Sequence, residues 1–562
     1  MNVAQAVGAV LASLGVDAAF GVVGSGNFHV TNALIEHGVR FVAARHEGGA
    51  ATMADAYART SGRVAVLSVH QGPGLTNAMT GITEAAKSRT PLIVLAGEAT
   101  APRSNFFVDQ AALATAVGAV PMRVTSAETA VAQAAEAFRV ARDERCTVLL
   151  NLPLEVQERQ VSAWPEPGTS GGAPREPGTS GREGEPGQED AARLAELLAA
   201  ARRPVFLAGR GARTARRDLE ELGGLTGALL ATSAVAKGLF RGSPWDLDVS
   251  GGFASPLTAG LIRDADVIVG WGCALNMWTM RHGTLVGAGA KVVQVDLDPG
   301  ALGLNHPIHL GVTGDVARTA RAVTGLLAGL LTGAGTAEAV PGLTGYRSEE
   351  LAGRIAGEGR WRDVPYADEG GDGRIDPRTL TIELDDLLPA ERVVSTDSGN
   401  FMGYPAMFLD VPDEGGFCFT QAFQSVGLGL ATAIGAALAQ PHRLPVAALG
   451  DGGALMGVAE LETVVRLGLP MLIVVYDDEG YGAEMHHFGP GGHPLGTVTF
   501  PPADLAAIAR GFGCEAVTVR AGEDLAAVAG WLGGPRERPM LVHARVSRAR
   551  GSWWLEEAFR GH

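Results

Sequence analysis

Cysteine and long apolar runs are both scarce in this chain. Four cysteines occur in 562 residues, without a CxxC pair or a Cys/His cluster, which argues against a disulfide framework or a zinc site. No segment reaches the roughly 18 apolar residues that a membrane-spanning helix needs. The first 22 residues also lack the basic start of a signal peptide. We therefore expect a reduced, cytoplasmic protein with no membrane partner.

Basic residues are also in deficit. Lys and Arg number 45 against 61 Asp and Glu, giving a formal net charge of −16. This balance argues against a general nucleic-acid binder or a protein of anionic membrane surfaces, although a local basic pocket for a phosphate is still allowed. Hydrophobic residues make up 46% of the chain, which is ample for buried cores. The length corresponds to about three or four domains.

Three regions alternate short apolar runs with runs of helical period. This alternation predicts an α/β protein with three doubly wound parallel-sheet domains. The domains are predicted at residues 1–164, 190–331 and 375–548. Residues 165–189, which contain EPGTSG twice, and residues 332–374 are predicted as linkers. Residues 549–562 form a short aromatic tail, interpreted as a surface helix or a flap over a neighbouring site.

Acidic residues stand at the ends of two neighbouring predicted strands. LPVAALG is followed by Asp451, and PMLIVVY by Asp477 and Asp478. A helix predicted at about 454–467 joins the strands, so a right-handed crossover brings both ends to one edge of the sheet. Glycines after Asp451 and a helix N-terminus favour an anion there. The pattern indicates a Mg²⁺–phosphate site; the alternative is that Asp451 caps a helix and the other two acids form a turn.

The same segment resembles the thiamine-diphosphate (ThDP) motif, in which GDG is followed at a distance by Asn. The likeness to the superfamily of acetolactate synthase, benzoylformate decarboxylase and pyruvate oxidase covers nearly the whole chain, with pyrimidine-binding, middle and diphosphate-binding domains in that order. It implies that Mg²⁺ is held by Asp451, Asp478 and the Gly480 carbonyl. The neighbouring cofactor contacts that it implies are Gly450, Gly452, Gly453, Tyr481 and Gly482.

One residue departs from the family pattern. The family usually has Asn where this chain has Asp478, and often Asn at Asp477 as well. An aspartate still binds Mg²⁺, but it adds negative charge beside a diphosphate. The change is expected to weaken cofactor binding or to require a compensating donor, and it leaves a non-catalytic paralogue as an alternative.

Two upstream segments resemble the rest of the diphosphate-side site. STDSGNFMGYP implies cofactor contacts by Gly399, Asn400 and Phe401. QAFQSVGLGL implies that Gln424 offers a backbone carbonyl to the aminopyrimidine and that Val426 wedges the cofactor. An apolar residue such as Val426 also suits an ordinary core.

The N-terminal region resembles the family's RHE signature in FVAARHEGGAATMADAYAR. A glutamate at a helix start is by itself only a favourable charge. The resemblance implies that Glu47 contacts the cofactor and protonates its aminopyrimidine, and a water-poor pocket would raise the glutamate's pKa. Glu47 and Asp451 lie in different predicted domains, and the family builds each site between two subunits. A homodimer or homotetramer is therefore expected.

The stretch VLSVHQGPGLTN resembles the next family block, in which Pro73 and Asn77 match the cofactor-binding GPGxxN core. Benzoylformate decarboxylase has His at the position of His70 and Ser in the loop that contains Ser25. A lone histidine is more often structural, but the resemblance favours His70 as a proton relay, because imidazole titrates near neutrality. Gln71 is a weaker catalytic candidate. The residues expected to line the substrate pocket are His29, Phe107, Gln110 and His282.

The resemblance leaves several functions open. We favour ThDP- and Mg²⁺-dependent decarboxylation of a 2-oxo acid with transfer of the acyl unit to a carbonyl acceptor, as in an acetolactate-synthase-like carboligase. The first alternative is a simple decarboxylase that releases an aldehyde, which Ser25 and His70 favour. A second is an FAD-dependent oxidase: a G-x-G follows a predicted strand at Gly209 and Gly211, but this motif is weak and FAD is not favoured.

Overall fold

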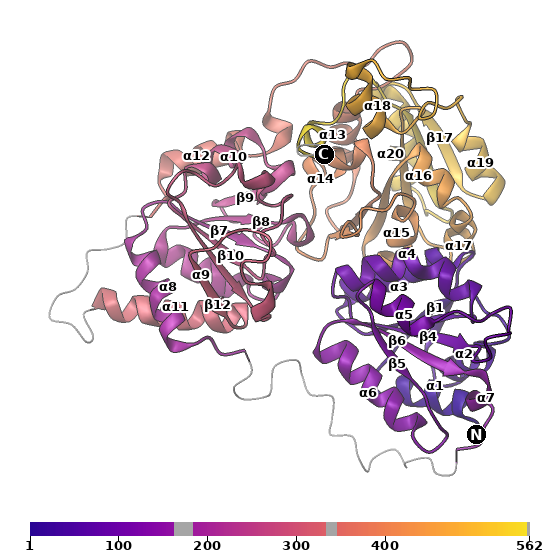
Figure 1. The fold of residues 1–562 in the computed structure, drawn as a ribbon. Helices are drawn as coiled ribbons and strands as arrows, with labels where there is room; N and C mark the ends of the chain where they lie inside the picture. The colour runs from indigo at the N-terminus through magenta and orange to yellow at the C-terminus, as the bar shows by residue number, and fades with distance from the viewer. Residues whose placement is uncertain (162–183, 333–344, 559–562) are drawn as a thin grey trace.

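The computed structural model describes residues 1–161, 184–332 and 345–558. They form three domains, each built on a six-stranded sheet with helices on both sides, and every strand pairing within the three sheets is parallel (Figure 1). The predicted fold class is confirmed. No helix within the described ranges has the length and apolar character to cross a membrane.

The N-terminal domain has the strand order β2-β1-β3-β4-β6-β5. Its strands are β1 (Ala18–Gly21), β2 (Arg40–Ala43), β3 (Ala65–Val69), β4 (Leu92–Glu98), β5 (Val120–Arg123) and β6 (Thr147–Pro153). Its helices are α1 (Val3–Ser13), α2 (Phe28–Glu36), α3 (Glu47–Ser61), α4 (Pro73–Lys87), α5 (Gln110–Ala116), α6 (Ala130–Asp143) and α7 (Leu154–Gln157).

The middle domain has the order β12-β11-β10-β7-β8-β9, so its topological switch point lies between β7 and β10. Its strands are β7 (Pro204–Ala208), β8 (Leu229–Thr232), β9 (Asp246–Val249), β10 (Val267–Trp271), β11 (Lys291–Asp296) and β12 (Leu310–Thr313). Its helices are α8 (Gln188–Ala200), α9 (Arg216–Thr226), α10 (Pro256–Arg263) and α11 (Val316–Thr332). Helix α12 (Glu349–Glu358) lies within the second predicted linker, whereas residues 165–183 of the first are outside the described ranges.

The C-terminal domain has the order β14-β13-β15-β16-β18-β17, which repeats the order of the N-terminal domain. Its strands are β13 (Arg392–Thr396), β14 (Phe417–Phe419), β15 (Leu444–Gly450), β16 (Leu472–Asp477), β17 (Glu515–Val519) and β18 (Met540–Arg545). Its helices are α13 (Pro377–Leu387), α14 (Gly403–Phe408), α15 (Gly429–Ala439), α16 (Asp451–Met456), α17 (Glu460–Arg466), α18 (Gly482–Phe488), α19 (Leu505–Phe512), α20 (Ala526–Gly533) and α21 (Trp553–Ala558).

The segment that connects β15 to β16 differs from the prediction. A single helix at about 454–467 was expected, but two short helices, α16 and α17, are present with a break at residues 457–459. Gly457 caps the C-terminus of α16, donating its N–H to Gly453 O. Glycine is a poor residue for a helix interior, so the break lies where the helix is weakest.

The N- and C-terminal domains share one hydrophobic core. Helix α3 of the first packs directly on α15 of the second, as Figure 1 shows, and both helices consist largely of alanine and glycine. Gly435 is needed at the contact, because a Cβ there would collide with the carbonyl oxygen of Met53. Small residues thus allow the two helices to approach closely and fix the relative position of the two domains.

A buried ion cluster reinforces this contact. The Arg59 guanidinium pairs with Asp55 at 2.5 Å and with Glu84 at 2.7 Å, and all three side chains are buried. Arg59 also donates to Phe419 O in the C-terminal domain at 3.1 Å. Glu84 in turn accepts hydrogen bonds from the backbone N–H groups of Ala422 and Phe423. The cluster therefore anchors the segment that precedes α15.

The Arg59→Ala variant is expected to lower the free energy of unfolding by about 3–5 kcal/mol, because it leaves two buried carboxylates without their cation. The matched control is Arg63→Ala, which removes an exposed arginine paired with Asp17 and is expected to cost at most about 1 kcal/mol. Thermal and urea unfolding followed by circular dichroism would measure both. Equal stability of the two variants would contradict this prediction.

Candidate functional site

Two carboxyl groups meet at the carboxyl ends of β15 and β16. Asp451 begins α16 directly after β15, and Asp478 directly follows β16, the adjacent strand. Both side chains are buried. Burial, and then the neighbouring Asp478 and Asp477, raise the pKa of Asp451 to about 8. Burial raises the pKa of Asp478 to about 7, and Asp477 adds to the effect. Two carboxylates held together in this way favour a cation between them.

The residues present suit Mg²⁺ rather than a metal that needs all of its ligands from the protein. Among the described residues, no group of three or more His, Cys, Asp or Glu side chains is arranged to hold a metal. These two carboxylates, with the Gly480 carbonyl that the resemblance implies as a third ligand, would leave other coordination positions for phosphate and water, as Mg²⁺ prefers. Gly482 is required beside them, because a Cβ there would collide with Oδ2 of Asp478.

The acidic residues on either side of Asp478 have basic partners. Asp477 Oδ2 lies 2.7 Å from His543 Nε2 and 3.5 Å from Arg545 Nε. Although burial acts to raise it, the pKa of Asp477 is lowered by the His543 and Glu479 hydrogen bonds and by the charges of His543 and Arg545. Glu479 pairs with the arginines at positions 374, 545 and 548. Within the described residues, Asp478 is therefore the one acid of this run for which no ion pair is found.

A loop after β13 completes this half of the site. Asp397 accepts hydrogen bonds from the backbone N–H groups of Gly427 and Leu428, and thereby fixes the turn that carries Val426. A Cβ on Gly453 would collide with Asp397 and lie 3.4 Å from Val426. Asp397 was not among the predicted site residues, although it stands in the quoted STDSGN stretch.

Most of the predicted diphosphate-side residues lie together here. A Cβ on Gly450 or on Gly399 would contact the Phe401 ring, and a Cβ on Gly452 would contact the Tyr481 ring. The Asn400 side chain donates to Asp478 Oδ2 at 3.4 Å. Gln424 adopts a positive φ of 59° and lines a cleft toward the middle domain.

Glu47 stands at the start of α3, in a tightly arranged turn. Asn77 Nδ2 donates to Glu47 Oε2 at 3.1 Å. The backbone N–H groups of Arg45 and His46 both donate to Glu460, a C-terminal-domain residue, at 3.0 and 3.1 Å. Glu460 was not predicted as a site residue, because its contact is with a segment more than 400 positions away in the sequence. The turn and Asn77 hold the Glu47 carboxyl in place.

His70 lies beside Glu47. A Cβ on Gly74, the residue after Pro73, would lie 3.0 Å from His70 Cβ and 3.6 Å from Glu47 Oε1. Gly26 N donates to His70 Nδ1 at 3.1 Å, so the neutral ring carries its proton on Nε2. Burial lowers the pKa of His70, while the charge of Glu47 acts to raise it. The Nε2–H of the neutral His70 ring is thus placed to donate a hydrogen bond.

The other predicted N-terminal residues differ in environment. Gln71 is buried, and its Oε1 has no hydrogen-bond partner among the described residues. Ser25, His29 and Phe107 are exposed. Gln110 is only 2% exposed and donates to Gly97 O and Asn151 Oδ1, which argues against the predicted substrate contact.

His282 lies in the middle domain. Its ring makes an edge contact with Trp278 at 6.3 Å, and its backbone has a positive φ of 51°. The predicted pocket role of His282 therefore gains no support.

Apolar side chains remain exposed near both halves of the site. On the C-terminal domain, Val426 is 37% exposed and Met456 is 57% exposed. On the N-terminal domain, Phe106 and Phe107 are both exposed, and Phe106 makes an edge contact with His70 at 5.4 Å. Exposed apolar groups around polar functional groups are typical of an interaction surface.

A cleft of about 950 Å³ lies between the middle domain and the other two domains. It is lined by Gly209 and Gly211 after β7 and by Gly272 after β10, at the switch point where doubly wound sheets bind ligands. Arg210 and Trp554 also line it. Its size and location suit a cofactor-sized molecule.

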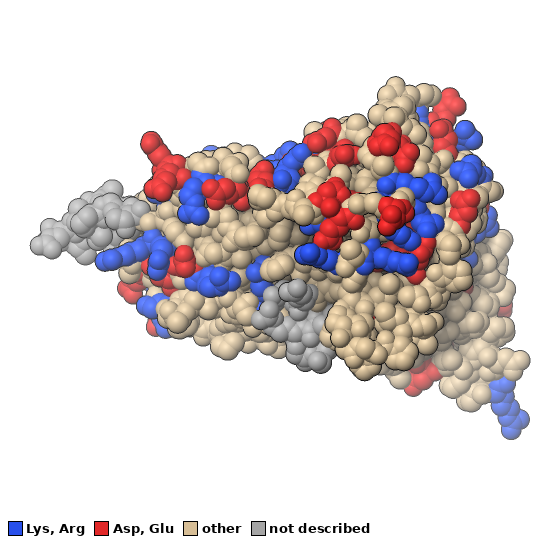
Figure 2. Space-filling model, turned by 90° about the horizontal axis from the view of Figure 1, so that it is seen from above, with Lys and Arg blue, Asp and Glu red and all other residues tan. Residues whose placement is uncertain are grey.

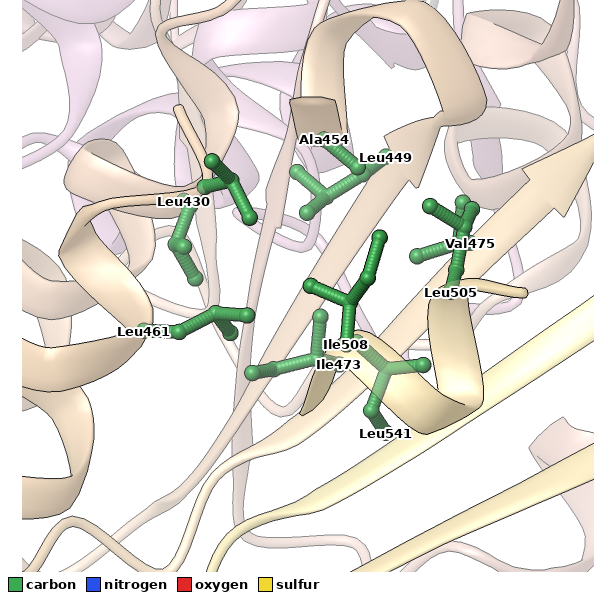
Figure 3. A pocket seen from close by; sticks show the side chains of 10 residues that line it. Leu430, Leu449, Ala454, Leu461, Ile473, Val475, Leu505, Ile508 and Leu541 are labelled. Atoms are coloured by element: carbon green, nitrogen blue, oxygen red, sulfur yellow. The ribbon is translucent and has the colours of Figure 1, made fainter. Parts of the chain in front are cut away.

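Two further features offer no additional ligand site. A cavity of about 10 Å³ beneath α16 is lined only by aliphatic side chains and alanine, as Figure 3 shows, so it is too small and too apolar for a ligand. On the face shown in Figure 2, basic and acidic side chains are interspersed. That view shows no basic face of the kind that nucleic acid requires.

Comparison with known proteins agrees with this geometry. Residues 1–137 match the thiamine pyrophosphate enzyme N-terminal TPP binding domain, residues 191–323 the central domain of such enzymes, and residues 397–544 their C-terminal TPP binding domain. The chain is 29% identical to a probable 2-ketoarginine decarboxylase (AruI) of Pseudomonas aeruginosa, over 93% of this chain and 90% of the relative.

Other relatives carry names of different reactions. The chain is 28% identical to sulfoacetaldehyde acetyltransferase of Castellaniella defragrans, over 93% of this chain and 89% of that protein. It is also 28% identical to the acetolactate synthase isozyme 2 large subunit of Escherichia coli, over 86% of this chain and 84% of that protein. With the domain order and the strand-end geometry, these matches show that the chain belongs to the thiamine-diphosphate-dependent enzyme superfamily.

Proposed function

We propose that this protein decarboxylates a 2-oxo acid and transfers the acyl unit to a carbonyl acceptor, with ThDP and Mg²⁺. The proposal rests on two sets of side chains: Glu47, which is held by Asn77 on the N-terminal domain, and Asp451 beside Asp478 on the C-terminal domain. The transfer step is supported by relatives named as an acetyltransferase and an acetolactate synthase.

Each group has a distinct role in this proposal. Bound ThDP supplies a nucleophilic carbon and an electron sink for the carbanion left by CO₂. Asp451, Asp478 and the Gly480 carbonyl would hold Mg²⁺, whose positive charge would favour the diphosphate group of the cofactor. Glu47 holds a proton at the cofactor's pyrimidine ring, and Asn77 keeps its carboxyl in position. His70 moves protons near the substrate, and its Gly26 hydrogen bond fixes which ring nitrogen carries the proton.

The runner-up is a simple decarboxylase that releases an aldehyde. The observation that favours it is the position of His70 beside Glu47: a His70 ring that first takes a proton from solvent would pass that proton to the carbanion and end the reaction. One relative is named as a decarboxylase.

An FAD-dependent oxidase is supported only by the cleft at the middle-domain switch point, and flavin absorbance of the purified protein would test it. A non-catalytic paralogue would not bind ThDP.

Product analysis distinguishes these reactions. Purified protein with ThDP and Mg²⁺ is incubated with pyruvate, branched 2-oxo acids, benzoylformate or 2-ketoarginine, with and without an aldehyde or 2-oxo acid acceptor, and followed by proton NMR. A coupled hydroxy-ketone supports the proposed transfer. Aldehyde alone supports the runner-up. Absence of bound ThDP would contradict both.

We further propose that two copies of the chain form each complete site, as a homodimer or a homotetramer. The exposed apolar residues near both halves support this proposal. The Met456→Glu variant is expected to weaken the subunit contact at least about tenfold, because burial of the methionine would be replaced by burial of a charge. Light scattering during gel filtration would measure it. The control, Leu304→Glu on the middle domain, replaces a residue that is 73% exposed and should leave the assembly unchanged.

A further inference from the structure

The C-terminal segment Gly551–Leu555 is built into the C-terminal domain rather than lying loose on it. Ser552, Trp554 and Leu555 are buried, although they lie near the end of the chain. Gly403 leaves space for the Trp554 ring, because a Cβ there would collide with the ring carbon Cδ1. Trp554 and Leu555 form a small hydrophobic cluster with Met402, in the loop that follows β13.

This segment makes two hydrogen bonds to one residue, Asn400. The backbone N–H of Ser552 donates to Asn400 Oδ1 at 2.8 Å. The Trp554 indole Nε1–H donates to the carbonyl oxygen of Asn400 at 3.0 Å. Both the main chain and the side-chain amide of Asn400 are therefore held by the end of the chain.

The bond from Ser552 decides the orientation of the Asn400 amide. Because Oδ1 accepts from Ser552, the amide presents its N–H₂ group to Asp478 Oδ2, at 3.4 Å. The opposite orientation would place Oδ1 beside a carboxylate and would be repulsive. Neighbouring Asp477 and Glu479 are compensated by histidine and arginine, whereas Asp478 receives the Asn400 amide.

We propose that the C-terminal segment is a positioning element of the metal site. Ser552 and Trp554 fix Asn400, and Asn400 binds one carboxylate oxygen of Asp478, so that the other oxygen is available to Mg²⁺. Asn400 thus supplies the compensating donor that an aspartate at this position requires. The inference rests on the proposed Mg²⁺ site and assigns the segment a role through Asn400, not a contact with substrate.

The same segment connects the metal site to the middle domain. The Trp554 ring contacts Trp278 at 6.1 Å and Phe253 at 6.4 Å between ring centroids, both in the middle domain. Trp278 and Trp554 also line the interdomain cleft. A shift of the middle domain would therefore reach Asp478 through Trp554 and Asn400.

The test compares two tryptophans on the same helix. Trp554→Phe keeps an aromatic ring but removes the N–H that binds Asn400. Trp553→Phe is the matched control, because Trp553 is 41% exposed and contacts Trp361 and Arg281 rather than Asn400. Mn²⁺ binding to the full-length protein with saturating ThDP is measured from the free-Mn²⁺ EPR signal. Trp554→Phe is expected to weaken Mn²⁺ binding about threefold to tenfold, and Trp553→Phe to leave it unchanged.

A second variant, outside helix α21, tests whether Trp554 acts on Asp478 through the side chain of Asn400. Asn400→Ala is expected to weaken Mn²⁺ binding about 10- to 100-fold, as for other groups that orient a metal ligand. Adding Trp554→Phe to Asn400→Ala should then cause no further loss. A full additional loss in the double variant would overturn the path through the Asn400 side chain.

The outcomes separate this inference from the proposed function. Unmodified protein that binds no Mn²⁺ in the presence of ThDP would overturn the metal site and the inference with it. Normal Mn²⁺ binding by the unmodified protein, with equal affinities for Trp554→Phe and Trp553→Phe, would overturn the inference alone. Near-ultraviolet circular dichroism confirms that each variant is folded.

Discussion

Replacement of Glu47 by glutamine is expected to lower the turnover number by about 10²- to 10⁴-fold, the usual range for loss of a general acid or base. Glutamine keeps the length of the side chain and accepts the hydrogen bond from Asn77, but it has no proton to exchange at the pyrimidine ring. Cofactor affinity should change little, because the residues proposed to hold the diphosphate and metal lie on the other domain. Steady-state kinetics and calorimetric titration with ThDP measure the two effects separately.

Glu36→Gln is the matched control for this variant. Glu36 lies at the end of α2 in the same domain and is exposed, so its replacement should change neither turnover nor binding. If Glu47→Gln turned over substrate at the rate of the unmodified protein, the role of Glu47 in proton transfer to the pyrimidine ring would be wrong. A loss of ThDP binding without a loss of turnover at saturation would instead indicate that Glu47 only binds the cofactor.

Replacement of Asp451 by alanine is expected to weaken Mg²⁺-dependent ThDP binding by at least about 100-fold, since removal of a residue that merely orients a ligand already costs about 10- to 100-fold. The fold should survive. Burial and the nearby Asp478 make the ionised form of Asp451 unfavourable, as its raised pKa of about 8 indicates, so alanine removes a buried carboxyl group that is itself unfavourable in its charged form. Thermal unfolding with and without Mg²⁺ and ThDP would show both effects.

Asp504→Asn provides the control for Asp451→Ala. Asp504 caps α19 in the same domain, and asparagine caps helices about as well as aspartate. The control should keep the rise in unfolding temperature that Mg²⁺ and ThDP produce in the unmodified protein. Retention of that rise in Asp451→Ala would show that the metal is held elsewhere.

The sequence was informative where local pattern and chain topology act together. Apolar runs that end at Asp451 and Asp478 predicted adjacent strands, and β15 and β16 are paired. A right-handed crossover is almost obligatory between parallel strands, so the meeting of these acids required no long-range information.

Local sequence patterns did not predict contacts between residues that lie far apart in the chain. Gln110 was expected in the pocket, yet Asn151, across the sheet, accepts from its amide. Glu460 supports the Glu47 turn, and Asn400 is held by Ser552; neither pairing has a signature in local sequence. The break between α16 and α17 was also missed, because the apolar period continues through Gly457 whereas the backbone does not.

The repeated strand order of the outer domains has a consequence for how such a protein changes over evolutionary time. Strand β3, which leads to His70 and Pro73, occupies the same place in its sheet as β15, which leads to Asp451. One scaffold therefore presents the proposed proton relay and the other the proposed metal ligand from equivalent strand ends. New chemistry requires changes only in these short loops, while the buried strands and the α3–α15 contact stay as they are. A lineage of such proteins is thus free to alter its reaction without rebuilding its architecture.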